Sequence, residues 1–263
     1  MDRETAKSEE SRDSVPAFRE RFWDQLKLWR SNPSWVDEPP ITAVTVPKGT
    51  LCHLKSTFKV GLPPEAVFGI ITDPGNKRVF KNIKEVKYRK VIKAENNRQL
   101  VEVEQAAIWK FLWFSGTIDV RVLVDEDQSS HTVSYKLAKE GFMKRFEGTW
   151  EIKPFYVDGE PGEAGRVASL VNLHQEVQPV LIPPPPVSWY VRGITTKTTE
   201  MMIGDLQAEG KRIREGNEDD DEANLQVKNE DEGGASKKEW KAKMKSSEKW
   251  KTSGENSRWR IPK

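Results

Sequence analysis

Residues 183–216 read PPPPVSWYVRGITTKTTEMMIGDLQAEGKRIREG, and this stretch predicts one long helix near the C-terminal end of the folded part. Its apolar stripe recurs at helical spacing and consists of Val187, Val191, Ile194, Thr198, Met201, Met202, Leu206 and Ile213. Pro186 suits a first helical turn, and Gly216 follows the cationic last turn as a stop signal. The helix would have about 28 residues and a length of ~42 Å. A helix of this length needs a broad apolar partner.

The segments before this helix have the alternation of β-strands. Residues 51–60 form the first predicted strand, in which Leu54 and Phe58 alternate with lysines. Two short helices follow, and six more strands are then predicted at residues 83–93, 98–109, 111–124, 131–137, 142–152 and 167–177. The short helices fall at residues 63–71 and 76–82. Because strands in succession without helices between them indicate an antiparallel meander, we expect an α+β fold, a curved sheet of about seven strands wrapped on the long C-terminal helix.

The polar ends of the chain predict four parts. We expect a disordered N-terminus at 1–13, an amphipathic helix and proline-rich connector at 14–50, the folded domain at 51–216, and a disordered tail at 217–263. The tail is acidic and then basic, with a net charge of about −8 over 215–235 and about +7 over 236–263. The basic half repeats tryptophan among lysines and arginines, at Trp240, Trp250 and Trp259.

The predicted helix at 15–31 has two interpretations. Its apolar face of Phe18, Phe22, Leu26 and Trp29 suits packing on its own domain. The same aromatic face with nearby arginines also suits a helix on a membrane surface, although Glu20 and Asp24 dilute the positive charge.

Several motifs resemble a known family. The segment VGLPPEAVFGIITDPGNKRVFKNIKEV is similar to the entry of the cyclase and coenzyme Q-binding branch of the START-like, or SRPBCC, helix-grip superfamily. The motifs SNPSWVDEPP, CHLKSTFKVGLPPEAVF, WKFLWFSGTI, FMKRFEGTW and PPVSWYVRGITTKTTE resemble the plant family called domain of unknown function 220. The resemblance covers about residues 31–216 and implies a helix-grip fold in a plant protein. It implies no catalytic residues, because that family has no assigned activity.

The resemblance also implies a ligand cavity between the concave sheet face and the last helix. Its candidate lining is Val103, Trp109, Phe114, Ile118, Val120, Tyr135, Phe146, Trp150, Val171, Leu173, Val191, Ile194, Thr198 and Met201. Most of these side chains are apolar and a few offer polar contacts, as in small-molecule pockets. The alternative is that these side chains fill the core completely.

A basic stretch follows the first short helix. It consists of Lys77, Arg78, Lys81, Lys84, Lys87, Arg89 and Lys90, with Lys93 beyond. In a helix-grip fold this stretch would lie near the cavity mouth and suit transient docking on anionic lipid headgroups. A solvated strand and helix face is the alternative interpretation.

Signals for catalysis are weak. Cys52 and His53 are neighbours on a strand and point to opposite faces, so they do not form a nucleophile–base pair. His53, His131 and His174 lack the spacing of metal ligands, and phosphate-binding glycine loops are absent. We therefore expect no catalytic residues, no metal and no cofactor.

The whole sequence favours a cytoplasmic or nuclear protein that is neither secreted nor transmembrane, although composition does not separate these compartments from a plastid. The N-terminus has no apolar signal segment, no run reaches 18 apolar residues, and the single cysteine, Cys52, suits a reducing compartment. The leading hypothesis is a non-catalytic binding or carrier module for a small hydrophobic or lipid-like ligand. The alternatives are a polyketide cyclase-like enzyme, with Tyr135 or a carboxylate moving a proton, and a scaffold whose charged tail binds nucleic acid or protein partners.

Overall fold

The computed structural model describes residues 14–111, 114–159 and 165–216. The predictions for residues 1–13 and for the tail at 217–263 lie outside these residues.

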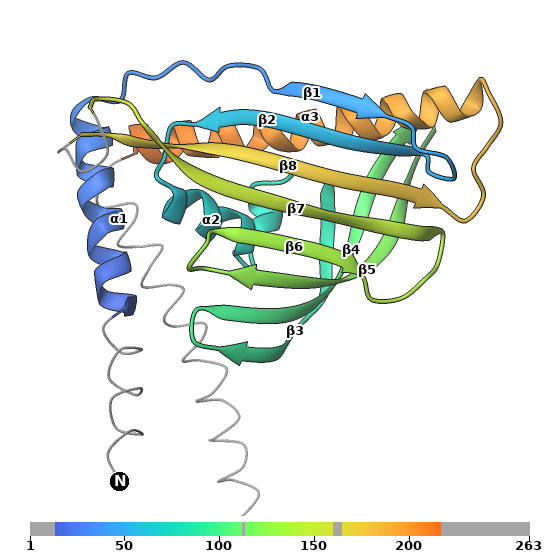
Figure 1. Ribbon diagram of the computed structural model, residues 1–263, viewed down its shortest axis with the longest axis horizontal. Helices are drawn as coiled ribbons and strands as arrows, with labels where there is room; N and C mark the ends of the chain where they lie inside the picture. The colour runs from blue at the N-terminus through green and yellow to red at the C-terminus, as the bar shows by residue number, and fades with distance from the viewer. Residues whose placement is uncertain (1–13, 112–113, 160–164, 217–263) are drawn as a thin grey trace, which may run out of the picture. The chain divides into compact units, whose positions relative to one another are not determined.

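The fold is α+β and is built on one antiparallel sheet of eight strands in the order β1-β2-β8-β7-β6-β5-β4-β3 (Figure 1). The strands are β1 (Ile41–Thr45), β2 (Cys52–Val60), β3 (Ile83–Glu95), β4 (Arg98–Phe111), β5 (Phe114–Asp127), β6 (Thr132–Leu137), β7 (Met143–Tyr156) and β8 (Val167–Pro179). Strands β3 to β8 follow one another as a meander, and β2 pairs with β8 to complete the order. The predicted meander is therefore confirmed.

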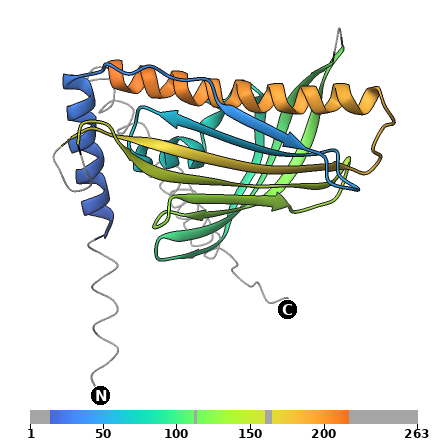
Figure 2. The same ribbon diagram turned by 45° about the horizontal axis from the view of Figure 1, so that its top comes forward.

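The long helix α3 (Val187–Glu215) runs along the sheet (Figure 2). It contacts both β2 and β4, which stand far apart in the strand order. Since a flat sheet would not bring both strands to one helix, the sheet must curve around α3. This is the helix-grip arrangement expected from the sequence.

The C-terminal half of α3 closes a solid core. Ile203 and Leu206 are fully buried against Phe58 on β2 and Leu173 on β8. The short helix α2 (Pro64–Thr72) begins at a proline and adds Val67 to the same core. Because side chains from three layers meet here, this end of the molecule is filled.

The helix α1 (Ser14–Ser31) packs on its own domain, in agreement with the first of the two interpretations. Trp29 is fully buried, and its indole nitrogen donates a 3.0 Å hydrogen bond to the carbonyl oxygen of Val167. The guanidinium groups of Arg166 and Arg214 lie over its ring at 5.0 and 5.7 Å. In the described part of the chain, no helix has the length and apolar character needed to cross a bilayer.

Three local predictions need correction. The sheet has one more strand than expected, because β1 forms at the edge of β2, within a segment predicted to be a connector. Prolines flank β1 on both sides, which suggested a connector. Four of its five positions are exposed at the edge of the sheet, so its sequence lacks the polar–apolar alternation that predicts a strand. The second short helix is a single 3₁₀ turn, η1 (Asn76–Arg78). Finally, Phe111 ends β4 instead of beginning β5.

Candidate functional site

The strand register places the predicted lining residues of the sheet on one face. Trp150 pairs with Leu173, and Val171 pairs with Phe58, so these side chains point toward α2 and α3. Cross-strand pairing continues the same face through Tyr135, Val103 and Ile118 toward the β4–β5 end. Trp109 and Phe114 share this backbone register, but their side chains lie outside what the structure describes.

This concave face has two different halves. Trp150, Val171 and Leu173 are buried in the solid core. In contrast, Val103, Ile118 and Val120 are only half-buried, although they belong to the same apolar face. Apolar side chains that face a helix and still contact solvent indicate that the helix does not fill the space above them. The candidate site is therefore the part of the concave face around Val103, Ile118 and Val120, whose neighbours Val101, Val122 and Val133 are buried.

The N-terminal half of α3 stands over this less filled half. Val191 packs against a small cluster of Leu51, Cys52, Val177 and Phe146, and Ile194 and Thr198 are half-buried. Met201 points outward and is 53% exposed, so it lies off the site; the buried face beyond it is that of Ile203 and Leu206. Val187 at the start of the predicted stripe is also exposed.

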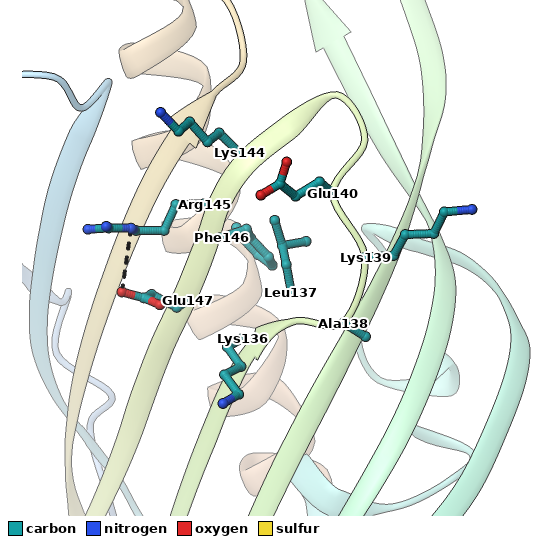
Figure 3. A pocket seen from close by; sticks show the side chains of 9 residues that line it. All are labelled: Lys136, Leu137, Ala138, Lys139, Glu140, Lys144, Arg145, Phe146 and Glu147. Atoms are coloured by element: carbon teal, nitrogen blue, oxygen red, sulfur yellow. Dashed lines mark ion pairs between the residues drawn. The ribbon is translucent and has the colours of Figure 1, made fainter.

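A pocket of about 360 Å³ opens in the sheet wall where β6 ends, and we call it the β6–β7 pocket (Figure 3). Leu137 and Phe146 point toward its centre, and the remaining lining residues are Lys136, Ala138, Lys139, Glu140, Lys144, Arg145 and Glu147. The ring of Phe146 also lies 5.2 Å from that of Tyr135, deeper on the concave face. The pocket thus has an apolar floor and a charged rim, and its floor adjoins the less filled half of the concave face.

The rim of the pocket is positively charged overall. Arg145 pairs with Glu176 at 2.7 Å, and Glu147 lies 3.8 Å from the same guanidinium. Lys136, Lys139 and Lys144 have no carboxylate within 4 Å among the described residues. These lysines favour an anionic group at the mouth.

Tyr135 supplies a polar group beside the pocket floor. Its hydroxyl donates a 2.8 Å hydrogen bond to Oε1 of Gln175. Burial raises the pKa of the Tyr135 phenol well above its usual value, so the group keeps its proton at neutral pH. Since its proton is committed to Gln175, the oxygen can still accept a hydrogen bond from a ligand.

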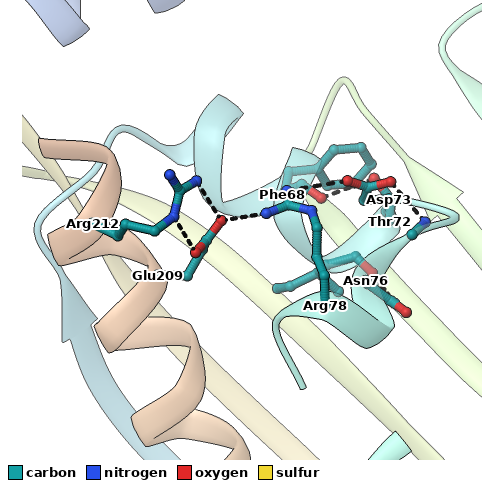
Figure 4. A network of polar contacts seen from close by, with 9 residues as sticks. Phe68, Thr72, Asp73, Asn76, Arg78, Glu209 and Arg212 are labelled. Carbon is teal, nitrogen blue, oxygen red and sulfur yellow. Dashed lines mark hydrogen bonds and ion pairs between the residues drawn. The ribbon is translucent and has the colours of Figure 1, made fainter. Parts of the chain in front are cut away.

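The predicted docking residues have varied surroundings. Arg78 forms a 2.6 Å ion pair with Glu209 of α3 and a 3.3 Å pair with Asp73 (Figure 4). Lys81 pairs with Asp205, Lys87 with Asp119, and Arg89 with the buried Glu126. Lys77, Lys84 and Lys90 have no carboxylate within 4 Å among the described residues. These ion pairs leave less free positive charge on the stretch than its composition indicates.

Cys52 and His53 have the geometry expected from strand alternation. Cys52 is buried in the cluster beneath Val191, and His53 lies on the other side of β2. Burial raises the pKa of the Cys52 thiol, although the positive charge of Arg192 opposes this effect. In the ranges that the structure covers, no three His, Cys, Asp or Glu side chains gather as metal ligands do.

Sequence reasoning missed Leu137, Gln175 and the rim lysines. Leu137 is the last residue of β6, and Gln175 of β8 lies on the same inward face as Leu173 and Val177. A polar residue at an inward position of a strand is a usable signal, because burial requires a hydrogen-bond partner. The rim lysines carry no such signal, since Lys136 and Lys144 are exposed strand residues and Lys139 lies in the turn between β6 and β7.

Comparison with known proteins places the chain in a family. The family model described as domain of unknown function DUF220 matches residues 42–163 and 160–216. The chain belongs to the DUF220 family. The match to DUF220 covers all the strands except the first residue of β1, together with α2 and α3. Among curated proteins, none matches the sequence.

Solved structures similar to this DUF220 chain include START superfamily proteins. The Zhui aromatase/cyclase from Streptomyces sp. R1128 has a TM-score of 0.46 at 11% identity, over 61% of this chain and 93% of that one. A STAR-related lipid transfer protein from Xanthomonas axonopodis has a TM-score of 0.45 at 13% identity, over 68% and 97%. A START superfamily protein from Mycobacterium smegmatis has a TM-score of 0.43 at 15% identity, over 61% and 98%.

Proposed function

We propose that this DUF220 chain binds a small amphipathic, lipid-like ligand between the sheet and the N-terminal half of α3. One observation carries the proposal: Val103, Ile118 and Val120 face inward and remain half-buried, while the same sheet face is fully packed under the other half of α3. Covering this apolar surface with a ligand would be favourable by about 25 cal/mol per Å².

The β6–β7 pocket gives the ligand an entry and an orientation. An apolar body would pass Leu137 and Phe146 toward Tyr135, and an anionic head would stay at Lys139 and Lys144. The volume of about 360 Å³ is in the range of small-molecule sites. The Tyr135 oxygen offers one hydrogen-bond acceptor on this path.

The arrangement favours binding over catalysis. The Tyr135 phenol keeps its proton, because burial raises its pKa, and it is already engaged with Gln175. A general base needs a pKa near the working pH, so this phenol is a poor candidate for the cyclase-like alternative.

Native mass spectrometry of the full chain tests the proposal. We expect the chain purified from cells to carry an extra mass that extracts into organic solvent. Ile194→Trp fills the space under α3 and should remove that mass, whereas Lys197→Trp, on an exposed position of the same helix, should retain it. A chain without extra mass that also shows no thermal shift with fatty acids, lysophospholipids or isoprenoids would overturn the proposal.

A further inference from the structure

One end of the molecule carries a concentration of exposed apolar side chains, which we call the apolar end surface. It consists of Phe142, Val180, Leu181, Ile182, Val187, Trp189 and Tyr190. These seven residues belong to a set of sixteen exposed large apolar side chains in the described ranges, and the other nine are distributed over α1, the β1 region, the β3–β4 hairpin, β7 and the middle of α3. Scattered apolar residues are normal on a protein surface, but a cluster of this kind marks an interaction site.

Three segments form the apolar end surface, and hydrogen bonds hold them together. The Val180 amide donates a 3.1 Å hydrogen bond to the carbonyl oxygen of Phe142, which joins the end of β8 to the β6–β7 loop. The Leu51 amide donates to the carbonyl oxygen of Val177 at 3.0 Å, and Arg192 Nε donates to the Leu51 carbonyl oxygen at 3.1 Å. The start of α3, the end of β8 and the β6–β7 loop lie at the same end in both views (Figures 1 and 2).

Members of the apolar end surface project from turns and from the first turn of a helix. Leu181 is 81% exposed and Trp189 is 62% exposed. They are not parts of a flat strand face that would extend another sheet. Tryptophan and tyrosine beside aliphatic residues are characteristic of proteins that insert into the headgroup region of a bilayer.

Lysines lie in the loops beside the apolar end surface. Lys139 and Lys144 lie in the β6–β7 loop and at the start of β7, and Lys48 lies in the β1–β2 turn, which the Leu51 bond holds beside β8. None of the three has a carboxylate within 4 Å in the part of the chain that the structure describes. Among these loops Glu140 supplies an opposing charge. Apolar tips with lysines beside them complement a surface of anionic headgroups over acyl chains.

We infer that the apolar end surface docks on an anionic lipid bilayer, with Leu181 and Trp189 in the headgroup–acyl boundary and the lysines at the phosphates. This surface differs from the basic stretch at 77–90, and it does not depend on a ligand being bound. Lys139 and Lys144, which lie beside it, also line the rim of the β6–β7 pocket, so docking would bring the mouth of that pocket to the lipid.

Vesicle flotation of the full chain tests the inference. We expect binding to vesicles of equal parts phosphatidylserine and phosphatidylcholine, weaker binding to phosphatidylcholine alone, and partial release by salt. The pair Leu181→Glu and Trp189→Glu should lower the partition coefficient by at least about tenfold, since it removes two apolar anchors. Val36→Glu is the matched control, because Val36 is 82% exposed and lies outside the surface, and it should bind as the unchanged chain does.

Each outcome of this experiment either supports or overturns the inference. Failure of the unchanged chain to bind anionic vesicles would overturn the inference, and so would equal binding by the double variant, because the contact would then lie elsewhere. A chain that dimerises through this surface in sedimentation, and does not bind vesicles, would assign the surface to a second copy. Ile194→Trp should still bind vesicles, which separates this test from that of the proposed ligand.

A labelled cysteine provides a second measurement that adds no charge. Cys52 is buried and is the single cysteine of the chain, so a thiol dye should react selectively with Leu181→Cys. We expect the emission of an environment-sensitive dye at position 181 to shift to the blue on anionic vesicles, and the same dye on Val36→Cys to remain unchanged. A dye at position 181 that stays in water while the chain floats with vesicles would overturn the inference.

Discussion

The hydroxyl of Tyr135 occupies the space where a side chain on Gly148 would stand. A Cβ atom built on Gly148 would lie 2.5 Å from the Tyr135 oxygen and 2.5 Å from the carbonyl oxygen of His174. The glycine therefore lets the tyrosine lie across β7 and reach Gln175 on β8. Phe146 and Trp150 lie two residues before and after Gly148 on β7, so apolar side chains flank the point at which Tyr135 crosses the strand.

We predict that Tyr135→Phe lowers the free energy of unfolding by about 1–3 kcal/mol, because it leaves the buried Gln175 without its hydrogen-bond donor. Gln175→Leu should also destabilise the chain. The double variant should lose less stability than the sum of the two single changes. When both partners are replaced by apolar groups, no buried polar group is left without a hydrogen-bond partner. Urea unfolding of the four proteins measures this coupling. Strict additivity would show that the two side chains do not interact.

Gly148→Ala should destabilise the chain more than an ordinary strand substitution does. The neighbouring carbonyl oxygen at 2.5 Å belongs to the backbone of β8 and has little freedom to move. We expect a lower unfolding midpoint and a changed environment of Tyr135 in the near-ultraviolet circular dichroism spectrum. Gly193→Ala is the control, because a Cβ there has open space and should leave the fold unchanged or stabilise the helix slightly. An unperturbed Gly148→Ala protein would contradict the close contact.

Periodicity predicted the strands β2 to β8 and the long helix, because each has its own alternation or apolar stripe, as in β8 and α3. It could not predict that Gln207 and Arg214 of α3 are buried. Gln207 donates to the carbonyl oxygens of Glu38 and Lys59, and Arg214 donates to Gly61 and pairs with Asp37. Asp37 and Glu38 come from the connector before β1, which has no repeating pattern, and Lys59 and Gly61 contribute backbone carbonyl oxygens at the end of β2.

The site was predicted as a cavity between the concave sheet face and the last helix, and its lining residues were chosen by strand and helix periodicity. Strand alternation placed Val103, Ile118 and Tyr135 together correctly, since cross-strand register preserves parity. Which half of that face is filled depends on where α2 packs and on where β6 ends. Tertiary contacts set both of these positions. Trp150 and Val120 therefore have the same place in the strand alternation but differ in burial.

Trp29→Ala should lower the free energy of unfolding by about 3–5 kcal/mol, the usual effect of removing a fully buried aromatic side chain. The change also removes the hydrogen bond to Val167 and the ring beneath two guanidinium groups. Leu28→Ala, one position earlier on the same helix and 38% exposed, should change the stability by less than about 0.5 kcal/mol. If both variants unfold at the same urea concentration, α1 contributes nothing to the domain.

Glu209→Gln should destabilise the chain near neutral pH by roughly 1–2 kcal/mol and have no effect in acid. Burial raises the pKa of Glu209, but hydrogen bonds from Arg212 and Arg78 outweigh it and hold the pKa below its ordinary value of 4.5. A carboxyl with a lowered pKa in the folded state stabilises the fold above its unfolded pKa. That stabilisation is lost as the pH falls through the folded value. Thermal unfolding from pH 7 to below pH 4 should show the melting temperatures of the two proteins becoming equal in acid. A difference in melting temperature that stays constant with pH would contradict the prediction.

The N-terminal half of α3 should open independently, and the Cys52 thiol can report this motion. Cys52 is fully buried beneath Val191, and burial raises its pKa against the opposing charge of Arg192, so the folded chain should react slowly with an aromatic disulfide. Val191→Ala removes the apolar contact above the thiol and should accelerate the reaction by roughly tenfold, while the chain remains folded. Val187→Ala, at an exposed position one turn earlier, should not. A reaction rate that equals the global unfolding rate in all three proteins would show that this half of the helix moves only with the whole fold, and that a ligand would have to enter through the β6–β7 pocket alone.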